Sequence, residues 1–266
     1  ASPYTPVVPD APIDPLAPFR LDGRVALVTG ASSGLGHRFA RVLDAAGARV
    51  VVTARRTDRL VALAEQLHDA VVLPADLAVP AMGGDLIRRV LEECGQLDVL
   101  VNNAGVGRTR PALEVGLDEF QRTIDVNLTT PFVLAQHAAR AMVEAGGGTI
   151  VNVTSIWGSV GVGQIPDAAY AASKGGLVNL TRELAAQWAR KGVRVNALAP
   201  GWFRTEMTEA TMFGDEAGAR WVQSHTPMGR SGEAGELDGA LLFLASDASS
   251  YVTGQSVYVD GGWTAI

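Results

Sequence analysis

The chain has 266 residues, of which 47% are hydrophobic and 19% are charged, as expected for a globular domain with a sizeable core. Its net charge of −6 argues against nucleic acid as the main partner, because phosphate backbones are bound by basic surfaces. The single cysteine, Cys94, excludes an internal disulfide, and we expect no metal site. Neither a membrane-spanning apolar run nor a secretory signal is evident, so we expect a cytoplasmic protein that does not bind membranes.

Proline recurs at every third position from Pro3 to Pro18. Polyproline II has three residues per turn, so these rings would line one edge of an extended rod. We therefore predict a proline-rich arm over residues 1–20, followed by a single domain over residues 21–266. The arm is expected to lie along its own domain or a neighbouring subunit. Its apolar contacts would come from Tyr4, Val7, Val8, Ile13, Leu16 and Phe19.

Beyond the arm, short β-rich runs alternate with helical patterns. Strands are predicted at residues 25–29, 49–54, 70–73, 97–101, 148–155, 193–198 and 256–259. Helices are predicted at residues 34–46, 57–68, 83–94, 117–126, 131–145, 168–191 and 234–245. Nearly continuous apolar strands that alternate with helices indicate an α/β fold. We predict a Rossmann-type, doubly wound parallel sheet of about seven strands with helices on both faces.

The first predicted strand ends in T-G-A-S-S-G-L-G, residues 29–36, and a helix follows at once. Glycines allow a tight turn and let a diphosphate approach the N–H groups of the helix N-terminus. The alternative is a plain glycine turn between a strand and a helix. The residues expected to hold the diphosphate are Gly30, Ser33, Gly34, Leu35 and Gly36.

The second predicted strand ends in T-A-R-R, residues 53–56, without an acid at its tip. A free ribose 2′-hydroxyl usually meets an acid at this place, whereas a 2′-phosphate prefers an arginine. A charge-assisted bond to phosphate contributes about 1.5–3 kcal/mol, roughly tenfold to a hundredfold in affinity. Arg55 and Arg56 therefore favour NADP(H), with NAD as the alternative cofactor. The competing interpretation is two solvated arginines at the start of a helix.

Tyr170 and Lys174 are four residues apart in Y-A-A-S-K, within a predicted helix. Side chains at this spacing project from one helix face. A phenol normally ionises near pH ~10, and a fixed ammonium beside it lowers that pKa. A tyrosine treated this way can exchange a proton with a substrate oxygen.

Further motifs follow in order along the chain. They are the glycine loop, Asp76 after the third strand, N-N-A-G at 102–105, Asn127, Ser155, Y-A-A-S-K at 170–174 and P-G-W-F-R-T at 200–205. In this set and order the chain resembles the short-chain dehydrogenase/reductase family in its compact single-domain form. The resemblance extends from about residue 21 to residue 262.

The resemblance implies a catalytic role for four residues. Tyr170 would be the general acid or base, and Lys174 would depress its pKa and hold the nicotinamide ribose. Ser155 would hydrogen-bond the substrate oxygen. Asn127 would hold a water that links Lys174 to solvent. The reaction would be hydride transfer between NADP(H) and a carbonyl or secondary alcohol.

The resemblance also implies the remaining cofactor contacts. Asp76, with Leu77 beside it, would meet the adenine. The adenine ribose would lie against Asn103, Ala104 and Gly105. The nicotinamide carboxamide would be held by Pro200, Gly201, Phe203 and Thr205, and the nicotinamide ribose by Tyr170 and Lys174.

The substrate is left open among 3-oxoacyl, sugar-acid and cyclic ketone classes. Ser155 and Tyr170 are fifteen residues apart, longer than the commonest family spacing, so the wall between them is expected to bulge. The family resemblance implies that segment 202–228 forms a mobile lid over the substrate and the nicotinamide. Residues proposed to face the substrate are Val106, Arg108, Trp157, Trp202, Met207, Met212, Phe213 and Trp221. Alternatively, these side chains pack the lid onto its own domain.

Two other functions remain open at this point. One is an NAD-dependent sugar-acid or polyol dehydrogenase of the same family. The other is a catalytically silent, cofactor-binding regulatory protein, because the same fold can serve proteins that have lost catalytic activity. The family resemblance also implies a homotetramer built on the helices near 117–145 and 168–191 and on the C-terminal strand.

Overall fold

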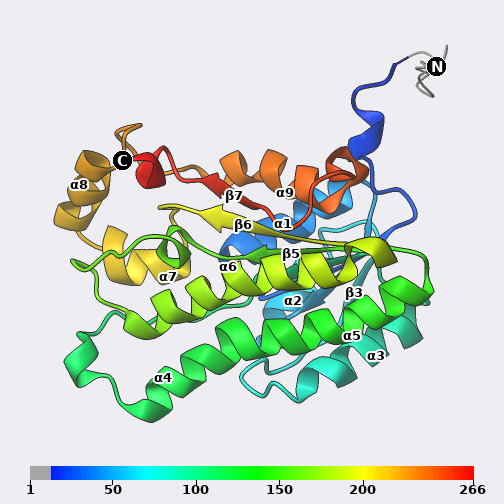
Figure 1. Cartoon of the computed structure of the whole chain (residues 1–266), viewed down its shortest axis with the longest axis horizontal. Helices are drawn as coiled ribbons and strands as arrows, with labels where there is room; N and C mark the ends of the chain where they lie inside the picture. The colour runs from blue at the N-terminus through cyan, green and yellow to red at the C-terminus, as the bar shows by residue number, and fades with distance from the viewer. Residues whose placement is uncertain (1–12) are drawn as a thin grey trace, which may run out of the picture.

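The computed structural model describes residues 13–266 and shows one seven-stranded sheet, all of whose strand pairs are parallel (Figure 1). The strand order across the sheet is β3-β2-β1-β4-β5-β6-β7. The strands are β1 Val25–Thr29, β2 Arg49–Thr53, β3 Ala70–Val72, β4 Val99–Asn102, β5 Gly148–Val153, β6 Val193–Pro200 and β7 Ser256–Val259. This arrangement confirms the predicted doubly wound fold.

Helices cover both faces of the sheet. They are α1 Gly34–Ala45, α2 Thr57–Ala64, α3 Met82–Cys94, α4 Leu117–Ile124, α5 Thr130–Glu144, α6 Ala168–Trp188, α7 Glu206–Thr208, α8 Glu216–His225 and α9 Asp238–Ala245. One core layer joins the sheet to α1, α2 and α9, and the other joins it to α3, α5 and α6. Figure 1 shows α1 and α9 on one side of the sheet and α5 on the other.

Strand β1 shows why these runs are apolar at every position. Ala26 and Val28 belong to one core layer, whereas Val25 and Leu27 belong to the other. All five residues of the strand are buried because helices cover both faces. The chain runs outward from β1 to β3 and then returns to β4 on the other side of β1. The strand order therefore reverses between β1 and β4, which opens a crevice at their carboxyl ends.

The two helices predicted at 117–126 and 131–145 form one continuous rod. A π-helical turn, Asp125–Thr129, joins α4 to α5. Pro131 follows this turn near the start of α5 and has no N–H to donate to the carbonyl of Asn127, four residues earlier. Wider π-type hydrogen bonding lets the rod continue past this place, so the proline does not separate the helices.

Helices α7 and α8 were not predicted, and they lie at the end of the sheet toward which β6 and β7 point (Figure 1). Residues 1–12 of the predicted arm lie outside the described residues. In the described part, Ile13 and Leu16 are 91% and 71% exposed, so these two side chains do not pack on the domain. Within residues 13–266, none of the helices combines the length and apolar character that crossing a membrane requires.

Gly36 in α1 is expected to tolerate no side chain. A Cβ there would lie 2.4 Å from Asn103 Nδ2 and 2.5 Å from the Gly30 carbonyl oxygen. We predict that Gly36→Ala lowers the free energy of unfolding by about 1–3 kcal/mol, measured by urea denaturation. Gly239 in α9 has open space around it, so Gly239→Ala should raise this free energy by about 0.5–1 kcal/mol. Equal effects of both substitutions would contradict the packing argument.

Candidate active site

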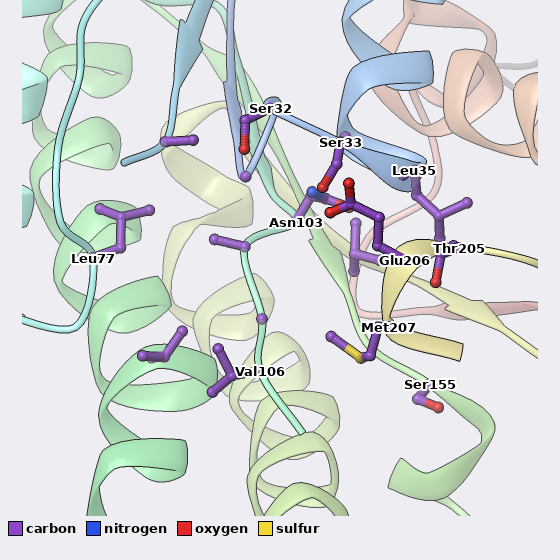
Figure 2. Close-up of a pocket in the computed structure, with 18 of the residues that line it drawn as sticks. Ser32, Ser33, Leu35, Leu77, Asn103, Val106, Ser155, Thr205, Glu206 and Met207 are labelled. Carbon is purple, nitrogen blue, oxygen red and sulfur yellow. The ribbon is translucent and has the colours of Figure 1, made fainter. Parts of the chain in front are cut away.

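A cavity of about 550 Å³ lies at the carboxyl ends of the central strands (Figure 2). Every residue predicted to contact the cofactor lines it: Gly30, Ser33, Gly34, Leu35, Gly36, Arg55, Arg56, Asp76, Leu77, Asn103, Ala104, Gly105, Tyr170, Lys174, Pro200, Gly201, Phe203 and Thr205. Ser155 lines it as well. Strand order thus brings together segments that are up to 175 residues apart, from Gly30 to Thr205.

The glycine loop fits a bound diphosphate. Gly30 and Gly34 have φ values of 68° and 56°, a left-handed conformation that favours glycine. Thr29 anchors the neighbouring loop, since its hydroxyl accepts hydrogen bonds from the N–H groups of Asn103 and Ala104, both at 2.9 Å. The side chain of Ser33 does not cap α1, so the first-turn N–H groups of this helix are not used by it. Donors of this kind suit phosphate oxygens.

Helix α6 carries Tyr170 and Lys174, and Asp167 fixes its start. The Asp167 carboxylate accepts hydrogen bonds from the Tyr170 N–H at 3.0 Å and from the Arg108 N–H at 2.7 Å. One side chain therefore caps the helix and anchors the loop after β4. Lys174 donates to the carbonyl oxygen of Val153 at 2.7 Å, which ties the same helix to the end of β5. Its ammonium lies 5.5 Å from the centre of the Tyr170 ring.

Asn127 lies behind the cavity wall and does not line the cavity. Its side-chain oxygen accepts from the Val106 N–H at 2.8 Å, and its amide donates to the Val106 carbonyl at 2.8 Å and to the Ser173 hydroxyl at 3.1 Å. The side chain therefore holds the β4 loop against α6. The water that Asn127 was predicted to hold stays a prediction.

The ionisation of the tyrosine differs from the sequence-based expectation. Burial raises the pKa of Tyr170 to about 12; a hydrogen bond from Ser155 opposes this rise, and the negative charge of Asp167 adds to it. Burial also lowers the pKa of Lys174 to about 8. Desolvation is thus the largest cause of both shifts. With its pKa raised in this way, the Tyr170 phenol is protonated at neutral pH and can act as a proton donor.

Ser155 caps a short turn and also faces the cavity. Its hydroxyl accepts a hydrogen bond from the Trp157 N–H at 3.3 Å and so caps the short 3₁₀ turn Ile156–Gly158. It also faces the cavity, beside Tyr170. The longer segment that follows is held by a hydrogen bond between the hydroxyls of Ser159 and Tyr258.

Most of the aromatic residues proposed to face the substrate pack against one another instead. The ring of Trp202 contacts those of Trp157, Trp221 and Trp263 at centroid distances of 6.3, 5.9 and 5.5 Å. Trp202, Met212 and Phe213 are buried in the core cluster beneath the lid. The alternative, that these residues pack the lid on its own domain, is therefore correct for them. Val106 and Met207 do line the cavity, whereas Arg108 lies near Glu119.

Several residues at the cavity were not singled out from the sequence. Ser32 and Glu206 line it, and Arg59 lies next to it through a contact with Glu206. Arg59 could have been found from its spacing, three positions after Arg56 at the start of α2. Glu206 had no sequence signal, because it comes from the lid, far along the chain from the arginines.

Comparisons with known proteins agree with this geometry. Residues 30–264 match the family described as Enoyl-(Acyl carrier protein) reductase. Galactitol 2-dehydrogenase (L-tagatose-forming) of Cereibacter sphaeroides is 42% identical over 92% of this chain and 97% of the relative. The 3-oxoacyl-(acyl-carrier-protein) reductase of Escherichia coli strain K12 is 36% identical over 91% of this chain and 97% of the relative.

Among solved structures, a gluconate 5-dehydrogenase from Burkholderia cenocepacia J2315, in complex with NADP and tartrate, superposes with a TM-score of 0.89. It is 40% identical and covers 94% of this chain and 99% of its own. The chain therefore belongs to the short-chain dehydrogenase/reductase family, as its sequence motifs indicated. It is an NAD(P)-dependent oxidoreductase.

The raised pKa of Tyr170 can be tested without a substrate. We predict no Tyr170-dependent phenolate below about pH 10 in the cofactor-free protein, because burial keeps the phenol protonated. The measurement is the ultraviolet difference absorbance of phenolate during a pH titration, with Tyr170→Phe as the subtracted reference. A component that depends on Tyr170 and titrates near neutral pH would show instead that the Lys174 charge outweighs burial.

Proposed function

We propose that the protein catalyses reversible hydride transfer between NADP(H) and a secondary alcohol or ketone of a polyol or sugar acid. The observation that carries this proposal is the placement of Ser155, Tyr170 and Lys174 in the same cavity as the glycine loop. The similarity to a galactitol dehydrogenase and to a gluconate dehydrogenase with bound tartrate supports small polyhydroxy substrates. Reduction of 3-oxoacyl thioesters is the second candidate, supported by the Escherichia coli relative.

The residues of the site divide the chemistry between them. The cofactor supplies or accepts the hydride. In the reducing direction, Tyr170 donates its proton to the substrate oxygen, and it takes that proton back in the oxidising direction. Ser155 donates a hydrogen bond to the same oxygen and stabilises its developing charge. The ammonium of Lys174 stabilises the phenolate that Tyr170 leaves behind, which offsets the cost of burying that charge.

The preference for NADP(H) rests on the arginines at the end of β2. Arg55 is exposed, lines the cavity and makes no ion pair with any residue in the described range 13–266. The guanidinium of Arg56 donates to the hydroxyls of Ser32 and Ser33 at 3.2 and 2.6 Å, which fixes it beside the glycine loop. A 2′-phosphate would find both cations within this part of the cavity. NAD remains the alternative cofactor.

Turnover tests the catalytic assignment. Tyr170→Phe is expected to lower kcat by about 100-fold to 10,000-fold while cofactor affinity changes little, because only the proton donor is lost. The assay follows NADPH oxidation and NADP reduction with galactitol, gluconate, their keto forms and a 3-oxoacyl thioester. The matched control is Tyr251→Phe, since Tyr251 is fully exposed and outside the cavity.

The outcomes of this assay separate the candidate functions. If the protein turned over only the thioester, the proposed substrate would be a 3-oxoacyl thioester and no longer a polyol or sugar acid. Cofactor binding by the parent protein without turnover of any substrate in the panel would favour the regulatory, catalytically silent alternative. Full activity of Tyr170→Phe would remove Tyr170 from the mechanism.

We also propose that the protein assembles as a homotetramer, as the family resemblance implied. Large apolar side chains on or beside α4 and α5 support an interface there: Leu113, Leu117, Phe132 and Val143 are exposed in the single chain. We expect sedimentation to give four times the chain mass of 27.8 kDa at micromolar concentration. A mass of one chain under these conditions would contradict the proposal.

A further inference from the structure

Glu206 reaches from the lid to the arginines at the cofactor cavity. It is the first residue of α7. Its carboxylate lies 3.0 Å from Arg56 Nη1 and 2.5 Å from Arg59 Nη1. Figure 2 shows the same carboxylate beside Ser33 of the glycine loop. An anion from the lid therefore occupies the cationic corner between the glycine loop and the start of α2.

Hydrogen bonds at the start of α7 fix the position of Glu206. Thr205 and Thr208 form a capping box around the start of α7, and the Thr208 hydroxyl also donates to the Phe203 carbonyl at 2.6 Å. These bonds fix the backbone from which Glu206 projects. Hydrogen bonds from Arg59, which has the larger effect, and from Arg56 lower the pKa of Glu206 to about 2. Its charge is consequently constant across the pH range in which the enzyme would work.

We propose that Glu206 is a residue that determines cofactor specificity, because its carboxylate competes with a ribose 2′-phosphate for Arg56 and Arg59. The inference rests on the proposed function and deepens it. The tip of β2 has no acid, and Glu206 supplies one from 150 residues further along the chain. A carboxylate in this corner can accept a hydrogen bond from a free 2′-hydroxyl, whereas it repels a phosphate.

The strength of this competition is limited by solvent. The side chains of Arg56, Arg59 and Glu206 are each about half exposed, at 41%, 45% and 54%. Exposed ion pairs are weak and are screened by salt, so a doubly charged phosphate can displace the carboxylate. Glu206 therefore lowers the preference for NADP(H) without abolishing it.

The test compares two nucleotide fragments that differ by the 2′-phosphate, 2′,5′-ADP and 5′-AMP. Isothermal titration calorimetry gives the dissociation constant of each with the full chain and with Glu206→Gln. We expect Glu206→Gln to increase the affinity for 2′,5′-ADP by about tenfold, because one like-charge contact with the phosphate is lost. The affinity for 5′-AMP should stay unchanged or decrease. Glutamine keeps the size of the side chain, so packing of α7 is preserved.

Glu209→Gln is the matched control. Glu209 is an acid of the same lid, but its partner is Arg204 at 3.4 Å. The substitution Glu209→Gln should leave the affinity for both fragments unchanged. The proposal is overturned if Glu206→Gln changes 2′,5′-ADP affinity by less than about twofold, if both fragments tighten equally, or if Glu209→Gln has the same effect.

Failure of this inference is distinguishable from failure of the proposed function. If both fragments bind and Glu206→Gln does not discriminate between them, only the role of Glu206 is refuted. If neither fragment binds any variant, the cofactor site itself is refuted, and the proposed function and the role of Glu206 fall together. With the active enzyme, the ratio of KM for NADPH to KM for NADH should fall in Glu206→Gln and stay constant in Glu209→Gln.

Discussion

The candidate active site depends on one buried cation, the ammonium of Lys174, which is held by the carbonyl oxygen of Val153. The residue is 3% exposed, and burial lowers its pKa to about 8. This bond ties α6 to the end of β5, so the helix that carries Tyr170 and the strand that leads to Ser155 cannot shift independently. The Asp167 cap and the Asn127 side chain hold the remaining wall, the loop after β4, against the same helix. Ser155, Tyr170 and Lys174 are thus positioned by polar contacts at strand ends.

The lid and the cofactor cavity belong to one electrostatic system. Glu206 pairs with Arg56 and Arg59, and the aromatic cluster around Trp202 packs the rest of the lid on the domain. Only Arg55, among the cations at the end of β2, is left without an ion-pair partner within residues 13–266. On the proposal made above, displacing this carboxylate would oppose part of the attraction between a 2′-phosphate and the arginines at the end of β2. A basic strand tip alone would then be an incomplete guide to cofactor preference.

The sequence patterns predicted helices and strands correctly where the observed burial follows the spacing of apolar residues along the chain. Strand β1 and helix α1 follow their predicted bounds closely, because an apolar run covered on both faces and a glycine turn are unambiguous. The rod through Asp125–Thr129 was predicted as two helices, since Pro131 looks like a helix start when its neighbours are unknown. Helix α7 was missed because it is only three residues long, and α8 because it contains Gly218 and few large apolar residues. The tryptophans were predicted to face the substrate because residue composition does not distinguish side chains that line a pocket from side chains that pack in a core.

The sequence by itself determined the parallel sheet, the glycine loop at the first crossing and the pairing of Tyr170 with Lys174 one helical turn apart. These features are encoded by neighbours in the chain, through apolar runs, turn residues and helical spacing. Only the tertiary structure decided the protonation of Tyr170 and Lys174, because desolvation depends on everything packed around a group. It also decided that the acid missing from the tip of β2 arrives as Glu206, since a contact between residues 150 positions apart depends on how the lid folds back over the cavity.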